Sequence, residues 1–279
     1  MAFDQPNVLG PPVADPGPLS RFKVRIRFTK GGDLRFLSHH DLMHCFERMF
    51  RRGNIPVKIS QGYHPMPRMA FALSLALGIV GGAEVLELEL DLPLSAEEVR
   101  QRLIEQAPQG LTILEVQAIE PNRRAQVRRA FYRMPIPVER QADLSERLAA
   151  LLASSECRVQ RSRPQPRQVD IRPYLDDLRL EDGYLKIAAW VTPTGTVRPD
   201  DLWPLLGLED VVANGALVER THLELHDEVA ADAGAANLNN QHFVTESTGA
   251  LAQGPESKTK VEPVLRPTAL FPGPMSFDS

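Results

Sequence analysis

Hydrophobic and polar residues alternate along two stretches of the first half of the chain, which predicts two half-buried strands. Residues 22–28 read Phe-Lys-Val-Arg-Ile-Arg-Phe, and residues 84–91 read Glu-Val-Leu-Glu-Leu-Glu-Leu-Asp. A strand with one buried face has this two-residue period. Mainly apolar stretches at residues 69–77 and 111–119 predict two further strands. The first half therefore carries enough strand pattern for one four-stranded sheet.

Two helices are predicted between these strands. Leu, Cys, Phe and Met residues recur at the spacing of one helix face over residues 42–50. Ser38, with Asp41 three residues later, resembles a capping box and predicts where this helix begins. Ser95 and Glu98 form a capping box that predicts the second helix. The order strand, helix, strand, strand, helix, strand is the ferredoxin-like βαββαβ arrangement.

The second half repeats this order less clearly. Asp143 is expected to cap one helix, and residues 200–206 are expected to form a short second one. A basic loop containing prolines lies between the two shortest strand patterns. Strand-like patterns cover residues 130–138, 157–160, 169–171, 184–191 and 217–225. These elements predict a second, less regular ferredoxin-like unit.

We therefore expect an α+β protein built from two ferredoxin-like units in tandem, at residues 20–122 and 123–226. Residues 1–19 are Pro-rich, and residues 227–279 lose all periodicity and are rich in small and polar residues. Both compositions predict disordered tails.

Charge is unevenly distributed along the 279 residues. The total of 32 Lys+Arg against 36 Asp+Glu gives a formal net charge of −4. Residues 21–70 carry 11 bases and three acids, and residues 123–168 carry 11 bases and four acids. A uniformly basic coat for nucleic acid is therefore excluded, but local basic surfaces are not.

Several classes of protein are excluded by composition. The two cysteines, Cys45 and Cys157, are too few for a disulfide scaffold or for a site with three thiolates. The longest uncharged stretch, residues 69–83, is shorter than the about 20 residues of a membrane-spanning helix. No secretory signal, P-loop or dinucleotide motif occurs. We expect a cytoplasmic protein that has no membrane segment and needs no cofactor.

The first candidate for binding is the face of the first sheet that points away from the helices. Lys23, Arg25 and Arg27 would lie there, and a basic sheet face of this kind can hold RNA. The alternative, which we favour, is that Glu87 and Glu89 on the neighbouring antiparallel strand neutralise these bases. Asp91 would add to the same acidic row.

The second candidate is a junction between the start of the first helix and the loop before the second strand. A helix N-terminus offers free backbone donors to an anion, and histidine, tyrosine and arginine side chains add polar groups. The alternative is that the serine and aspartate only cap the helix and the prolines only shape the loop. The candidate residues are Ser38, His39, Asp41, Gln61, Gly62, Tyr63, His64 and Arg68.

The third candidate is the second arginine-rich block, for which the sequence shows no obvious acidic partner. Such a block can contact a phosphate backbone or an acidic protein surface. The candidate nucleic-acid-binding residues are Arg123, Arg124, Arg128, Arg129, Arg161, Arg163 and Arg167. No metal site is expected, because His40 and His44 share a helix face without a third ligand.

Two motifs resemble those of the radical-SAM-linked protein family. They are Arg-Phe-Leu-Ser-His-His-Asp-Leu-Met at residues 35–43 and Ser-Gln-Gly-Tyr-His-Pro-Met-Pro-Arg at residues 60–68. Shorter resemblances occur at residues 170–173 and 197–199. Members of that family are fused to, or encoded beside, a cobalamin-binding radical SAM protein. The resemblance implies an accessory partner of such an enzyme, with Asp170, Arg172 and Arg198 in a second site.

The leading hypothesis is therefore a non-catalytic adaptor that presents a substrate to a separate radical SAM enzyme, with RNA as the candidate substrate. One alternative is a metal-independent endoribonuclease of the tandem ferredoxin-like type, with His39 and His64 as its acid–base pair. Another is a protein-interaction scaffold that has no nucleic-acid role. The sequence assigns no reaction and favours a role without catalysis.

Overall fold

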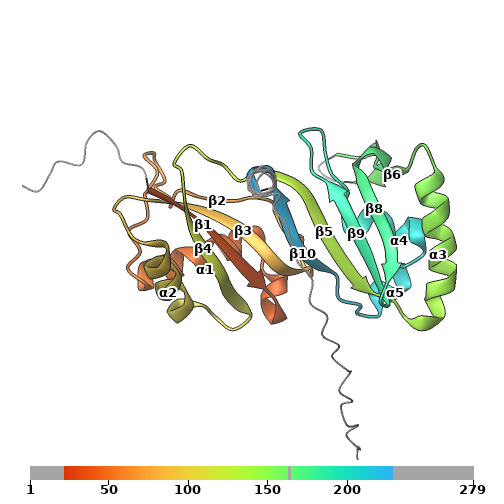
Figure 1. Cartoon of the computed structure of the whole chain (residues 1–279), viewed down its shortest axis with the longest axis horizontal. Coiled ribbons are helices and arrows are strands. Elements are labelled where there is room, and N and C mark those ends of the chain that lie inside the picture. Colours follow the sequence, from red (N-terminus) through yellow and green to blue (C-terminus); the bar gives the residue numbers. More distant parts are fainter. Residues whose placement is uncertain (1–21, 163–164, 229–279) are drawn as a thin grey trace, which may run out of the picture. The chain divides into compact units, whose positions relative to one another are not determined.

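Four strands and two helices make up the first half of the protein (Figure 1). The elements are β1 (Phe22–Lys30), the 3-10 turn η1 (Gly32–Phe36), α1 (His39–Arg52), β2 (Met69–Phe71), β3 (Val80–Leu90), α2 (Ala96–Gln106) and β4 (Leu111–Ile119). The strands lie in the order β4-β1-β3, and β2 pairs with β3. This arrangement is compatible with the predicted ferredoxin-like unit.

The second half has the same strand order with an inserted hairpin. Its elements are β5 (Val127–Pro135), α3 (Val138–Ala153), β6 (Arg158–Arg161), β7 (Arg167–Asp170), η2 (Arg172–Tyr174), β8 (Leu175–Glu181), β9 (Tyr184–Trp190), α4 (Pro199–Leu206), α5 (Glu209–Ala213) and β10 (Glu219–Leu225). The main strands lie in the order β10-β5-β9-β8, and β6 and β7 form a separate pair. The α+β class is confirmed, and the second half is also compatible with a ferredoxin-like unit.

The computed structural model describes residues 22–162 and 165–228. Residues 1–19 and nearly all of the tail predicted to be disordered lie outside the described residues.

Helix-facing residues of the sheet build two hydrophobic cores. In the first half, Val24, Ile26 and Phe28 of β1 are buried against α1 and α2. The rings of Phe28 and Phe46 meet edge to face, with centroids 4.9 Å apart. The predicted alternation of β1 is therefore confirmed, and so are the Ser38 cap and the capping box at α2.

The structure differs from the predicted elements in several places. β8 was missed because a bulge between Leu175 and Asp177 interrupts its alternation. The predicted strand over residues 69–77 ends at Phe71, since the apolar residues after it pack against the second core instead of continuing the strand. Helix α3 begins at Val138, and Asp143 lies inside it, where it pairs with Arg147 at 3.0 Å.

A short parallel pairing of β3 with β10 joins the two halves into one sheet, with Arg220 opposite Gly81. The Arg220 side chain is buried here and donates hydrogen bonds to the Glu84 carboxylate and to the carbonyls of Leu73 and Ser74. A Cβ at Gly82 would lie 2.7 Å from the Thr221 carbonyl oxygen, so only glycine permits this approach.

Candidate functional site

The first-half face, defined as the outward side of β1 and β3 bearing Lys23, Arg25, Arg27 and Glu87, is partly neutralised by its own acid. The Glu87 carboxylate lies 2.6 Å from the Lys23 ammonium and 3.0 Å from the Arg25 guanidinium. Glu87 stands opposite Arg25 in the antiparallel register. The favoured sequence interpretation is therefore confirmed for Glu87, whereas Glu89 pairs with Arg68 instead, at 3.4 Å.

A helical turn at residues 226–228 also lies on the first-half face. The Arg25 guanidinium donates to both carboxylate oxygens of Asp227, at 3.2 and 2.9 Å. Glu228 pairs with Arg27, and Arg123 lies 3.8 Å from Asp227. Burial alone would raise the pKa of Asp227, but the Arg25 hydrogen bonds outweigh it and hold this pKa below its usual value. Residues 227 and 228 were expected in the tail and instead form part of this folded surface.

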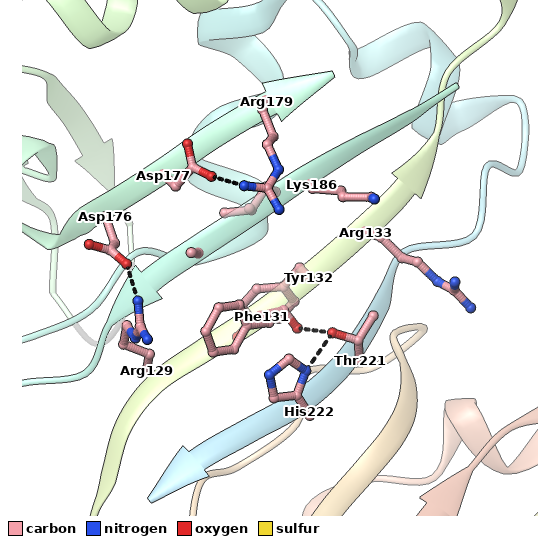
Figure 2. Close-up of a pocket in the computed structure, with 12 residues that line it drawn as sticks. Arg129, Phe131, Tyr132, Arg133, Asp176, Asp177, Arg179, Lys186, Thr221 and His222 are labelled. Atoms are coloured by element: carbon pink, nitrogen blue, oxygen red, sulfur yellow. Dashed lines mark hydrogen bonds and ion pairs between the residues drawn. The ribbon is translucent and has the colours of Figure 1, made fainter. Parts of the chain in front are cut away.

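The outward side of the second half, here called the second-half face, is more open. Ala130, Tyr132 and Met134 of β5 are buried in the core, so the alternate residues of β5 point away from the helices. Figure 2 shows the hollow at the centre of this face, which has a volume of about 400 Å³. Its lining is formed by Arg129, Phe131, Tyr132, Arg133, Asp176, Asp177, Arg179, Lys186, Ile187, Ala188, Thr221 and His222.

Phe131 occupies the middle of the second-half face. Its ring stacks on that of His222 from β10, with centroids 4.2 Å apart and planes 9° apart. On the other side, Phe131 stands opposite Ala188 of β9 in the strand register. Ala188 also lines the hollow, and its small side chain leaves room beside the phenylalanine ring.

Two further aromatic rings extend the second-half face along β9. The Arg129 guanidinium lies 5.2 Å from the ring centroid of Trp190 and 5.1 Å from that of Phe131. Arg133 lies 5.5 Å from the ring of Tyr184. Aromatic and basic side chains therefore alternate across the strands, an arrangement that the sequence analysis did not identify because the rings come from three separate strands.

The bases of the second-half face have carboxylate partners. Arg129 pairs with Asp176 at 2.6 Å and with Glu224 at 2.7 Å. Hydrogen bonds from Arg129 hold the pKa of Glu224 below its usual value. Further pairs are Arg133–Glu219, Arg179 with Asp177 and Glu181, and Lys186 with Glu181 and Asp182. The lining nevertheless contains four Arg and Lys residues and two carboxylates, because the remaining partners lie outside the hollow.

The expectation that the second arginine block lacks acidic partners was wrong for most of its residues. Arg128 pairs with Glu224 at 3.0 Å, and the buried Arg161 pairs with Asp201 at 2.6 Å. Within the described residues, Arg124 and Arg167 form no ion pair. Arg163 lies outside the described residues. Strand pairing brings these partners in from distant parts of the chain, which is why the sequence did not reveal them.

The predicted junction near the first helix is not assembled by polar contacts. The Ser38 hydroxyl accepts from the Asp41 backbone N–H at 3.2 Å and donates to its carboxylate at 2.6 Å, so both residues cap α1. The ring of His39 meets Phe71 edge to face, at 5.1 Å. Between the described residues, no hydrogen bond or ion pair joins residues 38–41 to residues 61–68.

The loop at residues 60–68 is closed at its base and open at its tip. The Ser60 backbone N–H donates to the Met66 carbonyl, and the Met66 backbone N–H donates to the Ser60 hydroxyl. Gln61, Gly62, Tyr63 and His64 are all exposed at the tip, and Tyr63 is 95% exposed. The Tyr63 ring meets His64 edge to face at 4.9 Å, so His64 contacts its neighbour and not His39.

The residues of the second implied site have local structural partners. The Asp170 carboxylate accepts from the backbone N–H groups of Cys157 and Arg172, at 2.7 and 3.1 Å, and these bonds, led by that of Cys157, lower its pKa. Arg172 donates to the carbonyls of Leu152 and Ser154 at the end of α3. Arg198 is the N-cap residue just before α4, where its backbone N–H donates to the Asp201 carboxylate at 2.8 Å.

Metal-ligating residues do not gather in the described part of the chain. His40 and His44 lie 3.4 Å apart and His44 lies 2.8 Å from Glu47, but no group of three or more such residues with metal-binding geometry occurs among the described residues. Both cysteines are buried, and burial raises the pKa of each thiol. No helix among the residues described is long and apolar enough to cross a membrane.

The sequence was compared with protein families, curated proteins and solved structures. The model of a family described as "Uncharacterized protein conserved in bacteria (DUF2344)" matches residues 23–199, which is more than half of the chain. Among curated proteins, no match is found. A solved structure of an unknown protein from Galdieria sulphuraria is 12% identical, with 74% of this chain and 98% of that chain covered, at a TM-score of 0.23.

Proposed function

The chain belongs to the DUF2344 family of uncharacterized proteins conserved in bacteria, and we propose that it is a non-catalytic accessory protein that holds single-stranded RNA on its second-half face. One observation carries the proposal. The stacked rings of Phe131 and His222 lie on a sheet face that no helix of the described residues covers, among arginine and lysine side chains (Figure 2). Some RNA-binding modules with a four-stranded sheet stack bases on aromatic rings of the sheet.

The geometry of the hollow supports contact with a base. Its volume of about 400 Å³ falls within the range of small-ligand sites, roughly 300–1,000 Å³. A base can occupy the space over Ala188 beside Phe131, or it can extend the Phe131–His222 stack on the exposed side of the imidazole. Stacking on an aromatic side chain contributes about 1–3 kcal/mol per base.

The surrounding bases supply contacts for the phosphates. Arg129, Arg133, Arg179 and Lys186 line the hollow. Their carboxylate partners are partly exposed, and exposed ion pairs contribute only about 0–1 kcal/mol each. A phosphate can therefore replace a carboxylate on an arginine fork at small cost. Such binding should weaken as the salt concentration rises.

Binding of a fluorescein-labelled single-stranded RNA to the full chain, followed by fluorescence anisotropy, tests the proposal. We expect Phe131→Ala to weaken binding by about 5- to 150-fold, because it removes one aromatic ring on which a base stacks. Phe36→Ala is the matched control, because Phe36 is an exposed aromatic residue of the first half. Equal affinity for the wild type and Phe131→Ala would overturn the site.

The same samples distinguish binding from cleavage. The RNA should remain intact on a gel after incubation with the protein. Cleavage that is lost in His39→Ala or in His64→Ala would instead support the endoribonuclease alternative. If the protein binds neither single-stranded RNA nor single-stranded DNA tightly, the protein-interaction scaffold becomes the better hypothesis.

The proposed partner is a separate radical SAM enzyme, which would act on the bound RNA in the cytoplasm. This part of the proposal rests on the resemblance of residues 35–43 and 60–68 to the radical-SAM-linked family. The exposure of Phe36 and Tyr63 in these two segments supports it, since both rings are accessible to a partner. Affinity purification of the tagged protein from its own cells should recover a radical SAM protein. Failure to recover one would exclude the adaptor role without affecting the RNA-binding result.

A further inference from the structure

Two arginines of the first-half face, together with Arg123 from the loop after β4, lie against two acids at the end of the described chain. The two terminal nitrogens of Arg25 donate to the Asp227 carboxylate, at 3.2 and 2.9 Å, and Arg27 pairs with Glu228. Arg123 approaches the same Asp227 carboxylate at 3.8 Å. A carboxylate held by two nitrogens of one guanidinium has the geometry in which arginine also holds a phosphate.

We infer that the first-half face is a second part of the RNA-binding surface, and that Asp227 and Glu228 occupy it in place of the RNA phosphates until RNA displaces them. This inference rests on the proposed function and assigns a regulatory role to the turn at residues 226–228.

The charge of the adjoining hollow depends on these two acids. The hollow has a volume of about 660 Å³, and three arginines and four carboxylates line it. Without the charges of Asp227 and Glu228, three arginines would face two carboxylates, those of Glu115 and Glu120. The turn therefore changes the sign of the hollow from positive to negative, which disfavours a polyanion while the turn is in place.

The ion pairs of the turn are exchangeable. Arg25 is only 4% exposed, but the Glu228 side chain is 36% exposed and that of Arg27 is 19% exposed. Arg25 keeps Glu87 as a partner when Asp227 leaves, so its charge does not become buried without a counterion. Replacing the turn by a phosphate thus exchanges one anion for another at the same forks.

The first-half face also adjoins the second-half face. Arg27 lies on β1 and His222 on β10, and β3 alone separates these two strands in the sheet order. An RNA strand whose base stacks at Phe131 can therefore extend its backbone toward Arg27 and Arg25.

The test is the double variant D227N/E228Q in the full chain, compared with the wild type by anisotropy with the same labelled RNA. We expect the variant to bind about three- to tenfold more tightly, because the partly exposed carboxylates of Asp227 and Glu228 no longer compete for the arginines. The salt dependence should also steepen, by about 0.7 in log–log slope for each additional phosphate that the protein neutralises.

Two further variants serve as controls. E115Q/E120Q removes the same charge from the same hollow but breaks no ion pair among the described residues, so its affinity for RNA should rise less. Adding R27Q to D227N/E228Q should return the affinity toward that of the wild type. The arginine that loses its carboxylate partner in D227N/E228Q, and so becomes available to RNA, is then absent.

The outcomes separate this inference from the proposed function. If the wild type binds RNA through Phe131 but D227N/E228Q binds no more tightly, the inference is overturned and the proposed function stands. If no protein binds RNA, inorganic polyphosphate serves as a probe of the arginine face alone. Tighter polyphosphate binding by D227N/E228Q would then support the competing role of the turn, and unchanged binding would overturn it. Thermal unfolding of each variant confirms that it is folded.

Discussion

The guanidinium of Arg220 on β10 and the carboxylate of Glu84 on β3 form a buried ion pair where the two halves of the sheet meet. Arg220 is 1% exposed, and its remaining donors bond to the carbonyls of Leu73 and Ser74. Because both charged groups of this pair are hydrogen-bonded, the cost of removing them from water is offset. It makes the joint between the halves sensitive to a single change.

Glu84→Ala should therefore destabilise the protein by about 3–5 kcal/mol, since it leaves the Arg220 charge buried without its counterion. Denaturant unfolding measured by circular dichroism gives this free energy. Glu89→Ala, which removes a partly exposed carboxylate from the same strand, is the control and should cost less than about 1 kcal/mol. A similar loss in both variants would contradict the special role of the Arg220–Glu84 pair.

His222 should make the stability pH-dependent below its ordinary pKa of about 6.5. Burial lowers the pKa of His222, the charges of Arg27 and Arg129 lower it further, and Glu224 opposes them. The unfolded chain therefore takes up a proton at higher pH than the folded chain, so the stability present above about pH 6.5 is lost as the pH falls through the lowered pKa. His222→Phe keeps a ring on Phe131 and should lose less stability between about pH 7.5 and 5.5 than the wild type. Equal losses in chemical denaturation would exclude this role.

Arg172 tests whether a residue of the implied second site binds ligand or supports the fold. Its side chain donates to the carbonyls of Leu152, Ser154 and Leu175, so it ties the end of α3 to the start of β8. We expect Arg172→Ala to lower the free energy of unfolding by about 1–3 kcal/mol, because these charged hydrogen bonds are removed. RNA affinity, measured well below the midpoint of unfolding, should not change. A variant of wild-type stability with weakened RNA binding would reverse this assignment.

Tyr63, in contrast to Arg172, should contribute little to stability and should serve contact with a partner. Its ring is 95% exposed at the tip of the loop, and its contact within the described chain is with the neighbouring His64. Tyr63→Ala should change the free energy of unfolding by no more than about 0.5 kcal/mol. If the loop contacts the proposed enzyme partner, the same variant should recover less of it in affinity purification, whereas RNA binding should be unchanged. A large loss of stability would show that the loop packs on the protein.

The sequence was informative wherever a local pattern of residues determines the geometry. The alternation in β1 predicted both its buried face and its basic face, and the antiparallel neighbour predicted that Glu87 would neutralise bases of β1, as its pairs with Lys23 and Arg25 do. The cap at Ser38 was predicted because the residues that form it are three apart. Such local patterns report directly on geometry, because the period of a strand and the spacing of a cap are fixed by the backbone.

The centre of the second-half face could not be predicted in the same way. Phe131 is the one aromatic residue on the outward face of β5, because the neighbouring Tyr132 is buried in the core, and the ring that stacks on Phe131 comes from β10. The carboxylates that hold Arg129 lie 47 and 95 residues away along the chain. Only the order of the strands brings these groups together. A bulge in β8 hid the strand that supplies Asp176, so the alternation of residues could not reveal this partner.

The position of β10 has a consequence for the way the protein is made. It is the last of the described strands along the chain, yet it lies inside the sheet, between β3 and β5. During synthesis on the ribosome, one edge of β5 and the start of β3 at Val80 and Gly81 must wait for it unpaired, and exposed strand edges invite association with other chains. The sheet is therefore completed only when residues 219–225 have been made, and a nascent chain that stalls before residue 219 would present the unpaired edge of β5 to the cell.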